Sequence, residues 1–371
     1  MQGQSLLPRL RALPEVEDIG IFAWYGLQGG IWEWNGFKIY PMHRDVYGND
    51  MYRAHAQDFK ADVVITLIDI WVLRDLAAQI APIQWWPWFP LDTEPASPFV
   101  LRSLKGASKK LVYSKWSQKL LANAGVEDTS YIPHGIETDK FKVLEPNETR
   151  QQFRDYHFGA DAEFVVTMVA ANKGEDDRKA FGYQLQAFQR FAKDKPNVRL
   201  WMHTTPGMDS KGVDIGAMLH LLDISDKVRF PLPYQYAMGY PVDWMSALYN
   251  SSDVFLGATK AEGFGIPLIE AGACGIPVIA TDFSAMSELV RWGIKVPAIA
   301  KEWCPLHGWR AIPSVDHIHA ALETLYEQWQ TNGKTWPMEQ RLAVQDQIHA
   351  EFGWDAIVRD YWHPLIKDSV Q

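Results

Sequence analysis

The sequence predicts an α/β protein with two Rossmann-like domains, and three observations support this prediction. The chain has 371 residues, which exceeds the size at which a single hydrophobic core usually stops growing. Strand and helix signals alternate with short connections, which is the pattern of parallel sheets that carry helices on both faces. This alternation occurs twice, before and after a polar, weakly patterned stretch at residues 138–162, and we place the domain linker inside this stretch.

The first run of elements forms the predicted N-terminal domain. Its strand signals are short runs rich in β-branched and aromatic residues, at residues 19–24, 37–40, 63–68, 83–86 and 111–113. Its helix signals lie at residues 6–13 and 116–124. The second helix is expected to end at Gly125, because glycine is typical of helix C-termini.

The second run begins with a strong strand signal at residues 164–170. Further strands are expected at residues 198–203, 228–231, 254–258 and 278–280. Helices are expected at residues 182–195, 215–222 and 244–249, near Pro267, and at 354–366. We therefore expect domains at residues 1–145 and 146–350, and a C-terminal helix within residues 351–371 that packs back toward the first domain.

Composition excludes several classes of function. The formal net charge of −9 argues against a nucleic-acid groove, which needs clustered basic residues. Neither end of the chain carries a long apolar run, so we expect a soluble protein without a transmembrane segment. The two cysteines, Cys274 and Cys304, fit a reducing cytoplasm and do not form a disulfide framework. No Cys or His cluster has metal-ligand spacing, so we expect neither a metal site nor a cofactor.

A glycine-rich loop between two predicted strands is the strongest candidate for a site. It contains Glu262, Gly263 and Gly265, and the following helix begins near Pro267 and carries Glu270. Ligands of open α/β sheets bind at the carboxyl ends of strands, where a helix N-terminus attracts an anion such as a diphosphate. Glycines let the backbone approach closely, and a carboxylate accepts hydrogen bonds from vicinal hydroxyls. From these residues alone, an ordinary tight turn with a solvated glutamate stays an equal alternative.

Several segments together resemble the GT4 family of retaining glycosyltransferases. The loop and the downstream Gly275-Ile-Pro-Val resemble the donor-site signature of that family, with two glutamates separated by seven residues. The stretch from Asn172 to Phe188 is similar to its diphosphate-binding segment. Further similarities lie at residues 113–116, 133–136 and 353–362. The resemblance implies a GT-B fold, in which two Rossmann-like domains face a cleft.

The resemblance also implies a nucleotide-sugar donor, linked to UDP, GDP or ADP and held mainly by the C-terminal domain. Arg178 and Lys179 would neutralise its diphosphate, Glu270 would bind the ribose and Glu262 the transferred sugar. A guanidinium can chelate two phosphate oxygens, and an ammonium supplies a compact charge. The other predicted donor-binding residues are Asn172, Gly263, Phe264, Gly265 and Ile266.

The implied reaction is hexosyl transfer to an unidentified acceptor with retention of anomeric configuration. The expected catalytic residues are Glu262, Arg178, Lys179 and Asp92. The family is thought to transfer through a front-face path without a glycosyl-enzyme nucleophile, so we do not interpret the two glutamates as a glycosidase pair. The alternatives are a nucleotide-sugar epimerase or other GT-B enzyme, and a non-catalytic nucleotide-sugar-binding subunit.

The N-terminal domain is expected to supply the acceptor side. Many family members carry a His or an acidic residue after the strand at residues 83–86, and Asp92 is the best positional match. The acceptor-side candidates are Tyr47, Asn49, Asp69, Trp86 and Glu94. Trp85, Trp86 and Trp88, at the end of that strand, are expected either to form a stacking platform or to belong to a Pro-rich aromatic loop that packs against a neighbouring domain. His134 is interpreted as a structural histidine.

One departure from the family pattern concerns the start of the chain. GT-B N-terminal domains normally open with a strand and a Gly-rich loop, whereas this chain begins at the helix expected at residues 6–13. We therefore expect the N-terminal domain to lack its first strand, and Gly3 to be a remnant of the loop.

Overall fold

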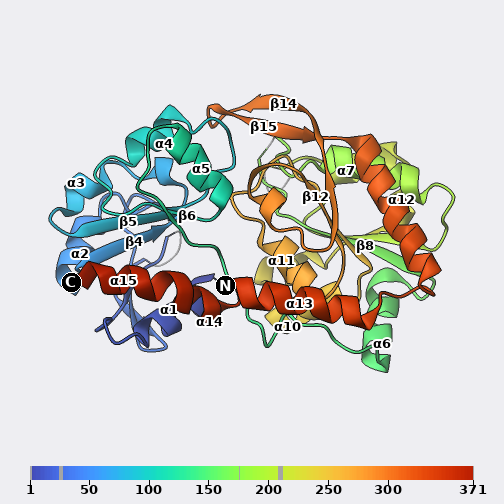
Figure 1. Ribbon diagram of the computed structural model, residues 1–371, viewed down its shortest axis with the longest axis horizontal. Helices are drawn as coiled ribbons and strands as arrows, with labels where there is room; N and C mark the ends of the chain where they lie inside the picture. The colour runs from blue at the N-terminus through green and yellow to red at the C-terminus, as the bar shows by residue number, and fades with distance from the viewer. Residues whose placement is uncertain (1, 25–27, 175, 208–211, 371) are drawn as a thin grey trace. The chain divides into compact units, whose positions relative to one another are not determined.

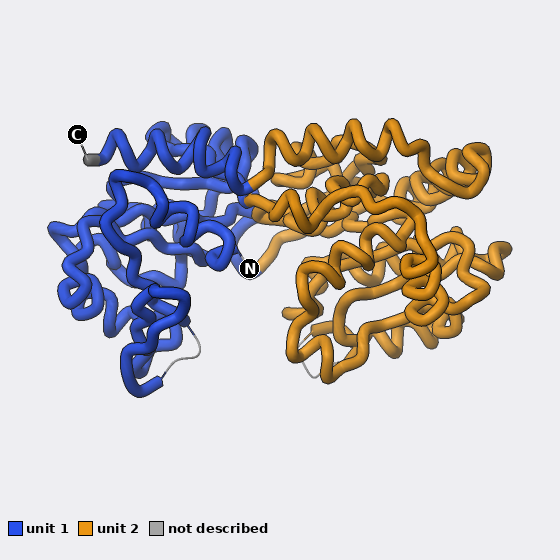
Figure 2. Tube along the Cα trace, turned by 90° about the horizontal axis from the view of Figure 1, so that it is seen from below, with its two compact units in different colours: residues 1–134, 305–308, 354–371 blue, residues 135–304, 309–353 orange. Residues whose placement is uncertain are grey.

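The chain divides into two compact α/β units in a computed structural model, which describes residues 2–24, 28–174, 176–207 and 212–370 (Figure 1). Unit 1 comprises residues 1–134, 305–308 and 354–371, and unit 2 comprises residues 135–304 and 309–353 (Figure 2). The N-terminal segment and the C-terminal helices thus belong to one unit. The border at residues 134 and 135 lies before the linker that we expected.

Unit 2 is built on a six-stranded sheet whose described strand pairs are all parallel. The strand order is β10-β9-β8-β11-β12-β13. The strands are β8 (Phe164–Val169), β9 (Val198–His203), β10 (Val228–Arg229), β11 (Val254–Gly257), β12 (Val278–Thr281) and β13 (Gly293–Val296). In order along the chain this is 3-2-1-4-5-6, the order of a Rossmann sheet, with its switch point between β8 and β11.

Helices cover both faces of this sheet, and a hairpin is added to it. The helices are α6 (Glu148–Phe158), α7 (Phe181–Ala192), α8 (Ile215–Leu221), α9 (Pro233–Met238), α10 (Val242–Asn250), α11 (Ile266–Ala273), α12 (Val315–Thr331) and α13 (Met338–Phe352). The hairpin consists of β14 (Ala298–Cys304) and β15 (Gly308–Pro313). A 3₁₀ helix spans Ser225–Lys227 and another Ser284–Glu288.

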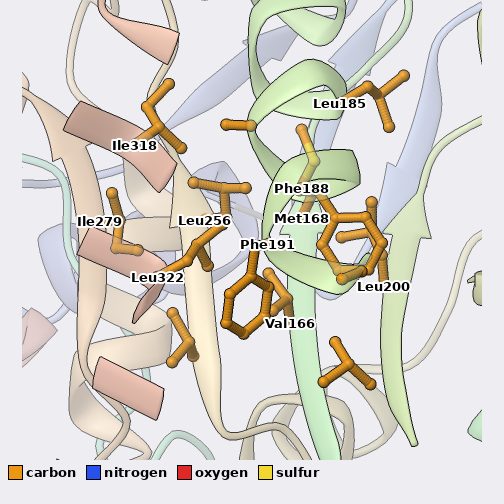
Figure 3. Close-up of a cluster of buried hydrophobic side chains, with 14 of the residues drawn as sticks. Val166, Met168, Leu185, Phe188, Phe191, Leu200, Leu256, Ile279, Ile318 and Leu322 are labelled. Carbon is orange, nitrogen blue, oxygen red and sulfur yellow. The ribbon is translucent and has the colours of Figure 1, made fainter. Parts of the chain in front are cut away.

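The main hydrophobic core of unit 2 lies between this sheet and helices α7 and α12. Figure 3 shows Leu185 and Phe188 of α7 beside Met168 of β8 and Leu200 of β9. Alternate strand residues face this core because side chains alternate between the two faces of a strand. The core thereby holds β8 and α7 together and positions the loop between them.

Unit 1 contains two separate sheets among its described residues. The four-stranded sheet has the order β4-β5-β6-β7 with parallel neighbours, and the three-stranded sheet has the order β1-β3-β2. The strands are β1 (Gly20–Phe22), β2 (Trp32–Trp34), β3 (Phe37–Tyr40), β4 (Val63–Leu67), β5 (Gln84–Phe89), β6 (Leu111–Val112) and β7 (Ser130–Tyr131). The helices include α1 (Gln2–Arg11), α2 (Tyr52–Phe59), α3 (Leu76–Ile80), α4 (Pro98–Ser103) and α5 (Lys115–Asn123).

The C-terminal helices of unit 1 pack against its N-terminal segment. They are α14 (Trp354–Ile357), a π-helical turn at Val358–Trp362 and α15 (His363–Val370). Arg9 of α1 forms an ion pair of 2.6 Å with Asp355. Trp362 packs edge-on against Trp88 of β5, with 5.2 Å between the ring centroids. The broad aromatic face expected for the last helix is therefore buried within unit 1.

The structure adds to two expectations about local structure. The stretch at residues 138–162, which was expected to contain the linker, also contains the eleven-residue helix α6, which Asn147 caps through its side chain. Trp85, Trp86 and Trp88 do not lie in a loop, because β5 continues to Phe89 and each of the three tryptophans is only 1% exposed. They cannot form a stacking platform, because no ligand reaches their faces.

Candidate functional site

Two loops meet at the switch point of the sheet in unit 2. The loop after β8 carries Arg178 and Lys179, and the loop after β11 carries Glu262. Lys179 Nζ lies 2.6 Å from Glu262 Oε1, and Arg178 Nη1 lies 3.2 Å from Glu262 Oε2. The backbone also joins the loops, because Lys260 N donates to the Arg178 carbonyl at 3.0 Å. The structure thus brings together three residues that the sequence predicted to share one site.

The carboxylate of Glu262 is held ionised by its two cations. Its side chain is only 16% exposed, and this burial by itself would raise the pKa. The charges of Lys179 and Arg178 outweigh burial and lower the pKa of Glu262 to about 2. The cluster keeps a net positive charge, because two cations face one carboxylate.

Glu270 lies in the next helix, α11, in a different environment. It is 6% exposed, and Tyr249 donates its hydroxyl to Glu270 Oε2 at 2.8 Å. Burial raises the pKa of Glu270 to about 7, against the smaller lowering effect of that hydrogen bond. The sequence predicted a carboxylate facing a cleft and gave no sign of Tyr249, because residues of α10 and α11 meet only in the fold.

The turn before α11 has the geometry expected of a helix-terminal anion site. Gly265 precedes the helix with a φ of 113°, which favours glycine, and Pro267 lies in the first turn. Glu262 N donates to the hydroxyl of Ser284 at 3.1 Å, which holds the loop from the other side. The backbone of Phe264, Gly265 and Ile266 therefore enters a helix whose N-terminus carries a partial positive charge.

The loop after β8 is stabilised by buried charged residues that the sequence did not indicate. Lys260 Nζ contacts Glu302 at 2.6 Å and donates to the Asp176 carbonyl at 3.1 Å. Arg310 forms an ion pair with Asp176, and Asp177 accepts from the first backbone N–H groups of α7. Glu302 and Arg310 come from the hairpin β14/β15, which no sequence motif predicted.

Asn172 braces the same region. It is 3% exposed, and its side-chain nitrogen donates to the carbonyls of Thr205 and Val213 at 3.2 and 2.8 Å. Its side-chain oxygen accepts from Val213 N at 3.0 Å. This side chain joins the ends of two loops, so direct donor binding by Asn172 stays a prediction without geometric support.

The acidic candidates of unit 1 lie beyond the carboxyl ends of adjacent strands. Asp69 follows β4, while Asp92 and Glu94 follow β5, and the two strands pair in parallel. All three side chains are partly exposed. They therefore gather at one edge of the four-stranded sheet, where open α/β sheets bind ligands. Their acceptor-side roles stay predictions.

The other unit 1 candidates have structural partners. Asn49 donates to Asp45 Oδ1 and to the Val72 carbonyl, and its oxygen accepts from Arg74 N at 2.7 Å. The Tyr47 carbonyl accepts from the hydroxyl of Tyr52 at 2.6 Å. These contacts fix the polar loop around residue 49 against the segment after β4.

Two further candidates from unit 1 are buried. Trp86 donates to Gln84 Oε1 at 3.0 Å inside β5. Because the side chain is buried, its ring cannot contact an acceptor substrate. His134 packs against Trp88 and Tyr113, and burial lowers its pKa to about 3. A histidine that remains neutral inside a core agrees with the structural role expected for it.

The described residues contain neither a group of metal-ligating side chains nor a membrane-spanning helix. Within the residues that the structure describes, no group of three His, Cys, Asp or Glu side chains is arranged to hold a metal ion. No described helix has both the length and the apolar character required to cross a membrane.

Comparison with known proteins identifies the domain that carries the cluster. Residues 163–325 match the family described as Glycosyl transferases group 1. The D-inositol 3-phosphate glycosyltransferase of Geodermatophilus obscurus is 26% identical over 172 residues, which cover 45% of this chain and 35% of that protein. The mannosylfructose-phosphate synthase of Agrobacterium fabrum is 28% identical over 172 residues, which cover 44% and 34%. The matched region thus spans about a third of these relatives.

Solved structures resemble the chain over most of its length. Sucrose-phosphate synthase from Thermosynechococcus elongatus superposes with a TM-score of 0.74 at 15% identity, covering 99% of this chain and 92% of that one. HepE of Anabaena, solved in complex with UDP and glucose, superposes with a TM-score of 0.62 at 16% identity, covering 88% and 81%. At such identities the likeness establishes the fold. Residues 163–325 therefore form a glycosyl transferases group 1 domain, and the likeness to these solved structures shows that the chain has a GT-B fold.

Proposed function

We propose that this chain is a retaining hexosyltransferase that moves a sugar from a nucleotide-diphosphate sugar to an acceptor hydroxyl. The cluster of Arg178, Lys179 and Glu262 at the switch point carries the proposal. It combines net positive charge with a fixed carboxylate in front of the N-terminus of α11. Positive charge attracts a diphosphate, and a carboxylate accepts hydrogen bonds from the hydroxyls of a sugar.

The reaction requires the bond between the anomeric carbon and the diphosphate to break. Negative charge then develops on the leaving phosphate oxygen, and Arg178 and Lys179 supply fixed positive charge there. Glu262 has a pKa of about 2 and stays ionised, so it accepts hydrogen bonds from sugar hydroxyls. Two cations engage its oxygens, which makes it a poor nucleophile and supports a path without a glycosyl-enzyme intermediate.

A panel of UDP-, GDP- and ADP-sugars, followed by thermal stability, tests the proposal. A ligand that binds only the folded state raises the unfolding temperature. We expect stabilisation by an intact donor, and we expect Arg178→Ala to abolish it. No response to any nucleotide sugar would falsify the proposal. Where a donor binds, chromatography of the sugar products separates transfer to an acceptor from epimerised donor.

We predict that donor affinity rises with pH through the titration of Glu270. Its pKa lies near 7, and the carboxylate, not the acid, accepts from both ribose hydroxyls. Between about pH 6 and pH 8 the ionised fraction, and with it the association constant, rises roughly tenfold. The experiment uses an intact nucleotide sugar as the ligand. Its diphosphate carries the sugar and has no group that titrates in this range, so the pH dependence reports on the protein. Calorimetric titration measures the constant, and Glu270→Gln is expected to flatten the profile. A fall in affinity as pH rises would contradict this role.

We predict that turnover persists in EDTA. Arg178 and Lys179 supply the charge at the leaving group, and Asp176 and Asp177 are engaged by Arg310 and by the α7 backbone. Donor hydrolysis is measured before and after chelation, with added Mg²⁺ as the control. Loss of activity that Mg²⁺ restores would contradict the prediction.

We also propose a cytoplasmic location, because a reducing compartment suits the two free and buried cysteines.

A further inference from the structure

A pocket in unit 2 lies outside the proposed donor site. It has a volume of about 650 Å³ and is lined by the end of α6, by β9 and β10, and by the segment from Phe230 to Trp244. This volume falls within the range of small-molecule sites. β10 is the edge strand of the sheet, and β11, which leads to Glu262, lies three strand spacings away, or about 14 Å.

Aromatic rings form the wall of this pocket. Tyr240 and Trp244 lie in close contact, with 3.9 Å between their ring centroids and an angle of 34° between the ring planes. His157 meets Trp244 edge-on at 5.4 Å, and Trp201 lies 6.0 Å from Trp244. The rings come from α6, from β9, from the segment before α10 and from the first turn of α10, so the fold itself assembles the wall.

Large side chains also stand exposed at the rim. Tyr234 and Met238, both of α9, are 76% and 69% exposed, and Tyr156 of α6 is 79% exposed. Clustered exposed apolar groups on a protein surface mark a site of interaction. Their position around a hollow suits a ligand that enters it.

Polar groups are set among these rings. The indole Nε1 of Trp201 is buried in a side chain only 2% exposed, and no described residue accepts a hydrogen bond from it. A buried donor without a partner is costly, which points to an acceptor that arrives with a ligand. Gln235 accepts from the Tyr240 hydroxyl at 3.0 Å through its oxygen, and Arg229 is braced against the backbone carbonyls of Asp226 and Val228.

We propose that this pocket is a second, non-catalytic carbohydrate site that holds one or two pyranose rings. The C–H face of a pyranose packs on an aromatic ring, and its hydroxyls accept from and donate to polar groups at the edges. A lipid chain would offer no acceptor to the indole Nε1 of Trp201. The choice of carbohydrate over a planar base rests on the proposed function, because a sugar-transferring protein encounters glycans.

Saturation-transfer NMR of the full chain with maltose, cellobiose and diacetylchitobiose tests the site. We expect one of these probes to bind in the millimolar range, and saturating nucleotide sugar to leave this binding unchanged. Tyr234→Ala removes one exposed stacking ring and is expected to weaken binding roughly two- to tenfold. Trp32→Ala is the matched control, because Trp32 is 58% exposed in unit 1 and lies outside the pocket.

Three results would overturn the site. They are no binding of any of the three probes, displacement of the bound saccharide by free uridine or by nucleotide sugar, and a concentration-dependent dimer that Tyr234→Ala dissolves. Failure of the proposed function can be distinguished from failure of this carbohydrate site, because donor binding is measured in the same samples. Arg178→Ala is expected to lose the donor and keep the saccharide, whereas Tyr234→Ala is expected to do the reverse.

Discussion

Lys179→Ala is expected to lower kcat/KM for sugar transfer by about 100- to 1000-fold. Lys179 is the nearer cation to Glu262, at 2.6 Å, and we propose that its ammonium stabilises the charge that develops on the leaving group. Removing one preorganised electrostatic partner from an active site typically costs a factor of this size. The loss is expected mainly in kcat, because the developing charge exists only in the transition state. Steady-state kinetics with the donor identified by the binding panel measures both constants.

Lys193→Ala is the matched control for this variant. Lys193 is an exposed lysine at the end of α7, whereas Lys179 lies just before that helix. We expect Lys193→Ala to change kcat/KM less than about twofold, because surface charges away from a site have small effects. Thermal unfolding of both variants shows whether either has lost its fold. A folded Lys179→Ala protein with near wild-type kcat/KM would show that Lys179 does not contribute to the reaction.

Phe188→Ala is expected to lower the free energy of unfolding of unit 2 by about 3–5 kcal/mol. Phe188 of α7 is fully buried in the core beneath β8 and β9 (Figure 3). Truncation removes the transfer free energy of the ring and leaves a cavity that close-packed neighbours fill only in part. Donor binding is expected to weaken as well, because α7 and β8 together position the loop that carries Arg178.

Urea titration followed by circular dichroism measures the free energy of unfolding. Leu221→Ala is the control, because Leu221 is 83% exposed at the end of α8 and its truncation is expected to stay within about 0.5 kcal/mol. A Phe188→Ala protein as stable as the control would mean that the core repacks without a cavity. That result would contradict the close packing described for α7.

Much of the architecture could be predicted from local sequence patterns. The strand from residue 164 and the helix after it were predicted because buried strands and amphipathic helices have their own periodicities. The loop around Gly265 was recognisable because a positive φ demands glycine and the next helix tolerates proline only in its first turn. The family resemblance then named the residues that the switch point brings together.

Other features could not be read from the same patterns. The strand was predicted to end at residue 86, because the run of proline and tryptophan that follows looked like a loop, yet Trp88 continues β5 and packs on Trp362 of the distant C-terminal segment. The hairpin β14/β15 supplies Arg310 to the loop before α7 across more than a hundred residues of sequence. Long-range contacts of this kind leave no local periodicity.

The sequence by itself determined the α/β class, the Gly-rich turn and the presence of two glutamates with two basic residues. Only the tertiary structure decided the state of those glutamates. Glu262 is ionised because Lys179 and Arg178 reach it from another loop, and Glu270 has a pKa near 7 because α11 is buried beside Tyr249. The physical reason is that a pKa depends on burial and on the charges within a few ångströms, and both are set by segments far apart in the chain.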